Sequence, residues 1–115
     1  MRQSAEDFLP LAPAVVHILL ALAGEEMHGY GIMQEVARQS EGRYKLGPGT
    51  LYDNLQRLLK QGLVEEAGQD SEDSRRRYYR LTTLGRRVIA AEIARLEGVV
   101  REARLHIRVP QTGRS

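Results

Sequence analysis

The sequence predicts a mainly α-helical fold with one small β-hairpin. Three observations lead to this prediction. Apolar residues recur at helical spacing in four stretches of the chain, and Gly or Pro marks the ends of most of these stretches. Between the third and fourth stretches, residues 77–81 place two Tyr between Arg residues, which suits a half-buried strand. The length of 115 residues favours a single domain.

The first two predicted helices cover residues 14–23 and 28–40. The first is apolar on nearly all sides, so we expect it to be buried, and Gly24 ends it. Gly29 and Gly31 weaken the first turn of the second helix. We expect another group to approach the backbone closely there, because such an approach would compensate for the cost of glycine.

A short link, residues 41–46, leads to the third predicted helix. Gly47 and Pro48 mark its start, because Gly is an acceptable N-cap and Pro fits the first helical turn. Leucines separated by 4, 3 and 1 residues form its buried stripe, and Gly62 ends it. The opposite face carries the polar residues Thr50, Asp53, Asn54, Gln56, Arg57 and Lys60.

The predicted hairpin has strands at residues 63–67 and 77–81, joined by a polar turn at 68–74. Thr82 then caps a last helix that runs from Thr83 to about Ile107. Residues of this helix at spacings of 4, 3, 4, 3 and 4 form the a/d seam of a coiled coil: Ile89, Ile93, Leu96, Val100, Ala103 and Ile107. The rest of so small a domain cannot bury this whole seam, and the seam therefore predicts a homodimer interface. The alternative is packing against the first helix of the same chain.

Helix, helix, helix, hairpin, helix is the order of a winged helix-turn-helix followed by one extra helix. We therefore predict a winged helix-turn-helix DNA-binding domain at residues 11–82 and a C-terminal dimerisation helix at residues 83–107. Residues 1–10 and 108–115 are predicted to be flexible termini. Since a two-fold dimer reads a palindrome, the predicted partner is double-stranded DNA with a palindromic operator.

Positive charge is concentrated at the predicted wing. The chain has a net charge of +2, whereas residues 74–87 hold six Arg and no acidic residue, which leaves −4 for the rest. A local basic patch of this kind attracts a phosphate backbone. The alternative is a solvated Arg-rich loop. The acidic residues Asp70, Glu72 and Asp73 just before the patch fit DNA contact poorly.

The third helix carries side chains of the kinds that read base edges in the major groove. Arg57 could pair with guanine, and Asn54 or Gln56 with adenine. Any amphipathic helix has a polar face, so the basic hairpin beside the helix is what favours DNA. The predicted DNA-binding residues lie on the third helix, in the link before it and on the wing. They are Lys45, Gly49, Thr50, Asp53, Asn54, Gln56, Arg57, Arg75, Arg76 and Arg77.

Several function classes find no support in the sequence. Cys is absent, which excludes disulfides and thiolate metal sites. Three scattered His residues form neither a metal site nor a catalytic triad, so we predict no enzyme, metal or cofactor. No apolar run is long enough to span a membrane and no signal peptide is evident, so the predicted location is the cytoplasm. The alternatives to a DNA-binding regulator are a protein–protein interaction module without DNA binding and a ligand sensor.

Several motifs together resemble those of the PadR family of bacterial transcriptional regulators. They are HGYGI at residues 28–32, GPGTLY at 47–52, GLV at 62–64, RYYRLT at 77–82, and Gly85. The resemblance implies a winged helix-turn-helix homodimer, usually a repressor, that a phenolic acid or planar hydrophobic drug releases from its operator. It also places at or near the DNA the residues Tyr30, Gly49, Thr50 and Tyr52.

The single C-terminal helix makes the chain similar to the small-tailed subgroup of that family. Some small members sandwich aromatic drugs between tryptophans at the dimer centre. This chain has no Trp, and Phe8 is its only Phe. A stacking drug site of that kind is therefore not expected, although a small aromatic effector is.

Overall fold

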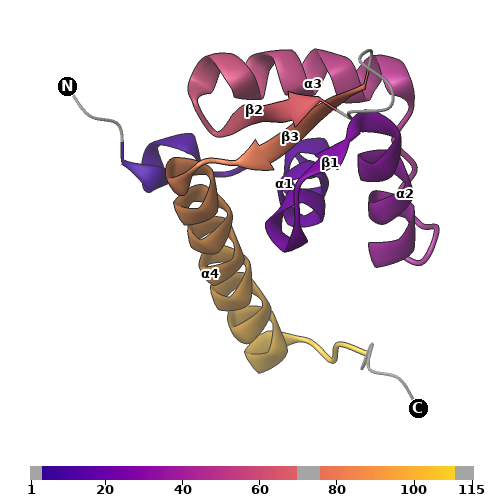
Figure 1. The fold of residues 1–115 in the computed structure, drawn as a ribbon. Helices are drawn as coiled ribbons and strands as arrows, with labels where there is room; N and C mark the ends of the chain where they lie inside the picture. The colour runs from indigo at the N-terminus through magenta and orange to yellow at the C-terminus, as the bar shows by residue number, and fades with distance from the viewer. Residues whose placement is uncertain (1–3, 70–75, 111–115) are drawn as a thin grey trace.

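The computed structural model describes residues 4–69 and 76–110 (Figure 1). Its elements confirm the predicted mainly α-helical fold with a β-hairpin. The predicted hairpin tip, including Arg75, lies outside the described residues. In chain order the elements are η1 (Ala5–Phe8), α1 (Pro13–Gly24), β1 (Met27–His28), α2 (Gly29–Gln39), α3 (Pro48–Gln61), β2 (Val64–Gln69), β3 (Arg77–Leu81) and α4 (Thr83–His106).

The core is built around α1, which contacts α2, α3, α4 and β3. Pro13 occupies its first turn, where a missing N–H costs nothing. The prediction of a buried first helix is confirmed by the side chains that lie inside: Ile18, Leu19, Ala21 and Leu22. Gly62 adopts a left-handed conformation (φ 76°) and ends α3, as its sequence position predicts.

The sheet has three strands in the order β1-β3-β2, all antiparallel. The prediction that His28 begins the second helix is wrong, because Met27 and His28 form β1 and pair with Tyr79 and Tyr78 of β3. His28 is the N-cap of α2 instead. A strand of two residues leaves no periodic pattern in the sequence, so only its pairing with the wing reveals it.

The wing is longer than its sequence pattern predicts. Gly68 was expected to begin the turn, but it belongs to β2 and pairs with Tyr78 of β3. The register shifts between Glu66 and Gly68, which bulges the strand and lets it extend to Gln69. On β3, Tyr79 and Leu81 are both buried, so this face of the wing packs on the core as predicted.

The start of α4 is hydrogen-bonded to the end of α3. The hydroxyl of Thr82 donates to the carbonyl of Gly62 at 2.6 Å and accepts from the amide of Gly85 at 2.9 Å, which confirms the predicted cap. The backbone of Gly85 lies directly against Leu63, so that a Cβ at Gly85 would overlap the Leu63 carbonyl oxygen. From this junction α4 runs away from the rest of the body (Figure 1).

A buried carboxylate ties the N-terminal segment to α4. Within residues predicted to be flexible, η1 forms a short 3-10 helix that packs on α4. Further along, the backbone amide of Leu11 donates to Glu92 of α4 at 3.3 Å. Glu92 is 1% exposed and is also paired by Arg95, with N–O distances of 2.7 and 2.9 Å. The Arg95 hydrogen bonds lower the pKa of Glu92 below its ordinary value.

We expect Glu92→Gln to destabilise the protein at neutral pH by about 1–3 kcal/mol, because the charge-assisted bonds from Arg95 are lost. A carboxylate with a lowered pKa stabilises the folded state above its unfolded pKa, and this contribution disappears as the pH falls through the folded value. The difference in unfolding free energy between the variant and the parent should therefore shrink below about pH 4.5. Urea unfolding at several pH values measures it. A difference that stays constant with pH would contradict this role, and Glu25→Gln, at an exposed position, is the control.

Candidate nucleic-acid interface

The outer face of α3 presents polar side chains to solvent. Gly47 and Pro48 open the helix without a side-chain cap, so the first backbone N–H groups of the helix point outward at its positive end. Lys45 lies exposed just before them. The predicted DNA-binding residues that this face exposes are Gly49, Thr50, Tyr52, Asp53, Gln56 and Arg57.

Asn54 does not belong to this exposed face, and its predicted exposure is wrong. Its side chain is 9% exposed and fully engaged within α3. The amide group donates to the carbonyl of Thr50 at 2.9 Å and accepts from the guanidinium of Arg57 at 3.3 Å. Asn54 therefore positions Arg57. Polar character alone could not distinguish this inward-facing amide from the solvated residues beside it.

The expected close approach to the α2 backbone is confirmed at Gly29. The ring of Tyr52 from α3 lies against Gly29, where a Cβ would overlap the tyrosine hydroxyl. At Gly31 a Cβ would meet only ordinary contacts, the nearest being Met27 Cβ at 3.5 Å. Gly29 is thus the glycine that lets the N-terminal turns of α2 and α3 pack against each other. This contact leaves Tyr52 45% exposed and Tyr30 of α2 62% exposed.

Residues of β1, α2, α3 and β3 line one cleft of about 210 Å³, which we call the tyrosine–arginine cleft. It brings together four of the predicted DNA-binding residues, from α2, from α3 and from the end of the wing nearest its tip. A hydrogen bond between the side chains of Arg77 and Glu66, 3.3 Å long, crosses the wing beside it. Burial raises the pKa of Tyr79, the inner wall of the cleft, and so favours its neutral phenol. The lining residues are His28, Gly29, Tyr30, Tyr52, Arg76, Arg77 and Tyr79.

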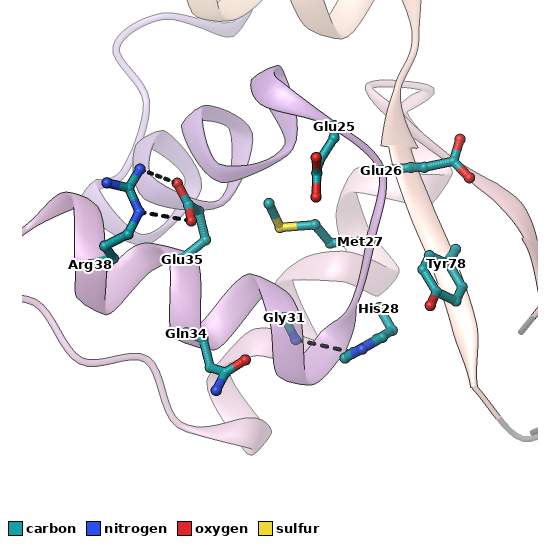
Figure 2. Close-up of a pocket in the computed structure, with 9 residues that line it drawn as sticks. All are labelled: Glu25, Glu26, Met27, His28, Gly31, Gln34, Glu35, Arg38 and Tyr78. Carbon is teal, nitrogen blue, oxygen red and sulfur yellow. Dashed lines mark hydrogen bonds and ion pairs between the residues drawn. The ribbon is translucent and has the colours of Figure 1, made fainter.

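His28 connects these elements and was not predicted as a site residue. Its Nδ1 accepts from the amide of Gly31 at 3.1 Å and so caps α2 (Figure 2). Its Nε2 lies 3.4 Å from a guanidinium nitrogen of Arg76, and its ring meets Tyr78 edge-on at 5.3 Å. The motif HGYGI contained this residue, but only the presence of β1 brings it to the wing.

A second cleft, of about 370 Å³, shares His28 with the tyrosine–arginine cleft and has three glutamates in its lining (Figure 2). Glu25 and Glu26 lie beside it, and Glu35 is paired there with Arg38. The hydrogen bond from Arg38 lowers the pKa of Glu35, so this carboxylate stays charged. A phosphate backbone is repelled by such a surface, which leaves the tyrosine–arginine cleft as the side that suits an anionic partner.

Towards the C-terminal end of α4 the residues of the predicted dimer seam become more exposed, with Leu96 and Ala103 half-buried. Val100 is 45% exposed and Ile107, just past the end of the helix, 63%. Ile89 is an exception, since it is 6% exposed within the core of its own chain, and Ile93 packs partly against that core. The predicted seam is therefore wrong at Ile89. A groove of about 530 Å³ follows the outer half and is lined by Ile93, Leu96, Glu97, Val100, Arg101 and Arg104.

A comparison with protein families identifies the family of this chain. Residues 18–91, from α1 through the wing into α4, match the transcriptional regulator PadR-like family. The chain belongs to this family. The resemblance that the sequence motifs predicted is thereby confirmed.

Relatives of this PadR-like chain agree in sequence and in fold. The transcriptional regulator Rv3488 of Mycobacterium tuberculosis is 37% identical over 87 residues, which are 76% of this chain and 78% of that protein. A transcriptional regulator from Clostridium thermocellum superposes with a TM-score of 0.70 at 22% identity and covers 82% of this chain and 92% of its own. A PadR family regulator from Clostridium difficile gives 0.66 at 23%, covering 82% and 97%.

The family consists of transcriptional regulators rather than enzymes. Within residues 4–69 and 76–110 no three His, Asp or Glu side chains gather closely enough to hold a metal ion. In the same part of the chain no helix has both the length and the apolar character needed to cross a bilayer.

Proposed function

We propose that this PadR-like chain is a cytoplasmic repressor that binds an inverted-repeat operator as a homodimer and is released by a small aromatic molecule. The observation that carries the DNA-binding part is the tyrosine–arginine cleft. There Tyr30, Tyr52 and Arg76 come from three separate elements to one surface beside the open end of α3. A helix in the major groove with a basic wing beside it needs this arrangement.

Each part of the surface has a distinct role in this proposal. The first-turn amides of α3 near Gly49 bind a phosphate, as do Lys45 and Arg76. Gln56 and Arg57 reach base edges in the major groove, Arg57 being oriented by Asn54. Thr50, Asp53, Arg75 and Arg77 complete the proposed contact surface.

The dimer follows from the outer half of α4. Its exposed groove of about 530 Å³ combines apolar walls with Glu97, Arg101 and Arg104. A second copy related by a two-fold axis would cover the apolar strip and pair charges of opposite sign along its edges. In this proposal residues 11–82 form the DNA-binding domain, and residues 83–107 supply the dimer contact.

A second candidate function is a protein–protein interaction module that uses the same shape without DNA. It is favoured by the ion pairs of the wing, in which Arg77 meets Glu66 and Arg80 meets Glu65 at 2.9 Å. These arginines already have carboxylate partners. Fluorescence anisotropy with the inverted repeat nearest to the gene discriminates between the two functions. Saturable binding that weakens with salt and exceeds binding to a shuffled duplex supports the repressor, and no binding at low salt supports the interaction module.

We expect Arg76→Gln to weaken binding to all DNA sequences alike, because Arg76 is assigned a phosphate contact. One lost phosphate contact should reduce the slope of log K against log [salt] by about one unit. Anisotropy titrations at four salt concentrations, on operator and on shuffled DNA, measure both effects.

Arg108→Gln is the control for Arg76→Gln. It removes the same charge from an exposed position beyond the end of α4. An unchanged slope for Arg76→Gln, or an equal change for Arg108→Gln, would show that Arg76 does not contact phosphate.

A further inference from the structure

His28 has a polar neighbour at each of its two ring nitrogens. Its Nδ1 lies 3.1 Å from the backbone nitrogen of Gly31, and its Nε2 lies 3.4 Å from a guanidinium nitrogen of Arg76. Both neighbouring groups can only donate, because neither a backbone N–H nor a guanidinium has a lone pair to offer. A neutral imidazole has one N–H and one acceptor nitrogen. His28 therefore accepts from only one of the two groups.

The contact with Gly31 is the better hydrogen bond. It is the shorter of the two, it is partly buried, and it satisfies a first-turn amide of α2 that has no partner within the helix. The contact with Arg76 is longer, is exposed and involves a long flexible side chain. The ring of Tyr78 meets the imidazole edge-on, at 81°, and restricts its rotation. Nδ1 of His28 is thus the acceptor, and Nε2 carries the proton.

With this tautomer, two donors lie next to each other in the tyrosine–arginine cleft. The Nε2 of His28 and the guanidinium of Arg76 belong to residues that both line it. Among the described residues, no carboxylate lines this cleft. The guanidinium has five N–H donors, so it can bind a further acceptor beside its other contacts. An anionic oxygen that accepts from both groups would stabilise the pair, and a phosphate group supplies such oxygens.

We propose that His28 is a phosphate contact of this protein, its Nε2–H and the Arg76 guanidinium donating to the same phosphate group. The inference rests on the proposed function for the source of that phosphate, which is the DNA backbone. Strand β1 makes the contact possible, because its pairing with β3 holds His28 beside the wing. The bound phosphate would then link the N-cap of α2 to the wing.

Nitrogen NMR tests the tautomer on the full-length chain without DNA. At about pH 8, where an ordinary histidine is neutral, long-range ¹H–¹⁵N spectra should place the proton of His28 on Nε2. A proton on Nδ1 would make Nε2 an acceptor for Arg76 and overturn the proposal. Inorganic phosphate at millimolar concentration should then shift the Nε2 resonance saturably, and Arg76→Gln should abolish that shift. No saturable shift in the parent chain would also overturn the proposal, whether or not the chain binds DNA.

Two substitutions separate the roles of the two ring nitrogens. His28→Asn keeps an acceptor near the position of Nδ1, and Asn is a favoured N-cap, but its side chain does not reach as far as Nε2. His28→Gln places an amide N–H near the position of Nε2 and loses the cap. His28→Asn should unfold near the parental Tm and bind both operator and shuffled DNA about ten-fold more weakly, because it lacks one hydrogen bond to a charged group.

His28→Gln should show the opposite pattern. Its Tm should fall by roughly 3–6 °C because the cap is lost, yet it should bind DNA more tightly than His28→Asn does. Thermal unfolding and fluorescence anisotropy at about pH 8 measure the two effects. If His28→Asn instead binds DNA as the parent does and His28→Gln binds more weakly, His28 acts only as a helix cap and the proposal fails.

Salt dependence and a double-mutant cycle test whether the two donors share one phosphate. His28→Asn removes a donor without charge, so the slope of log K against log [salt] should stay parental, whereas Arg76→Gln lowers it by about one unit. With a shared phosphate, the fold-loss of affinity in the double variant should be smaller than the product of the two single losses. A loss equal to that product would place the two residues on different phosphates and contradict the proposal.

These measurements separate the inference from the proposed function. If inorganic phosphate binds through His28 and Arg76 but the chain binds no DNA duplex, the repressor proposal fails and the phosphate site stands. If the chain binds operator DNA and both His28 variants keep parental affinity, the repressor proposal stands and the phosphate contact of His28 is wrong.

Discussion

Val100→Asp is expected to convert the protein to a monomer and to reduce its affinity for a two-half-site operator by about 10²–10⁴-fold. Val100 is 45% exposed in the groove of α4. In the proposed dimer the substitution buries a carboxylate in an apolar seam, and the two-fold axis brings a second one near it. The affinity falls because the second half-site no longer binds as part of the same assembly.

Sedimentation velocity gives the oligomeric state, and anisotropy on full and half operators gives the two affinities. Affinity for a single half-site should change little. Ala94→Asp adds the same charge to an exposed position of α4 outside the groove, and it should leave the dimer intact. A dimeric Val100→Asp protein with parental operator affinity would show that α4 does not form the dimer contact.

Gly85→Ala should destabilise the fold by about 2–4 kcal/mol, which corresponds to a fall in Tm of roughly 8–16 °C. The added Cβ would overlap the carbonyl oxygen of Leu63, a backbone atom that cannot rotate away. The start of α4 must therefore shift, which strains the Thr82 hydrogen bonds to Gly62 and Gly85.

Thermal unfolding followed by circular dichroism measures the effect of Gly85→Ala. Gly98→Ala on the same helix is the matched control, because its Cβ would meet nothing closer than Arg101 Nη2 at 3.8 Å. Relief of glycine's unfavourable helix propensity should stabilise that variant by about 0.5–1 kcal/mol. If both substitutions behave alike, the contact with Leu63 does not determine the need for glycine at position 85.

The elements most accurately predicted from the sequence are those whose signals are local. Pro48 and Gly62 bound α3 because one fits a first helical turn and the other adopts a left-handed cap. Strand β3 was predicted at its observed bounds, since its alternating residues show which side is buried. These two elements contain the GPGTLY and RYYRLT motifs, which are among the motifs that predicted the family.

Features that depend on contacts between distant segments were not predictable in this way. β1 exists because two residues pair with the wing, and it is this pairing that brings His28 to Arg76. Asn54 and Glu92 are polar, yet both are buried with hydrogen-bond partners. Composition and periodicity assign such residues to the solvent side, since neither reveals a partner from elsewhere in the chain.

The hydrogen bond from Thr82 to Gly62 links the start of α4 to the end of α3. Because the start of α4 is hydrogen-bonded to the end of α3, we expect a tilt of α4 to be passed on to α3. Over the 24 residues of α4, about 36 Å at 1.5 Å per residue, a tilt of about 10° moves the far end by roughly 6 Å. In the proposed dimer, a tilt of this size would change the spacing of the two α3 helices relative to successive turns of the double helix.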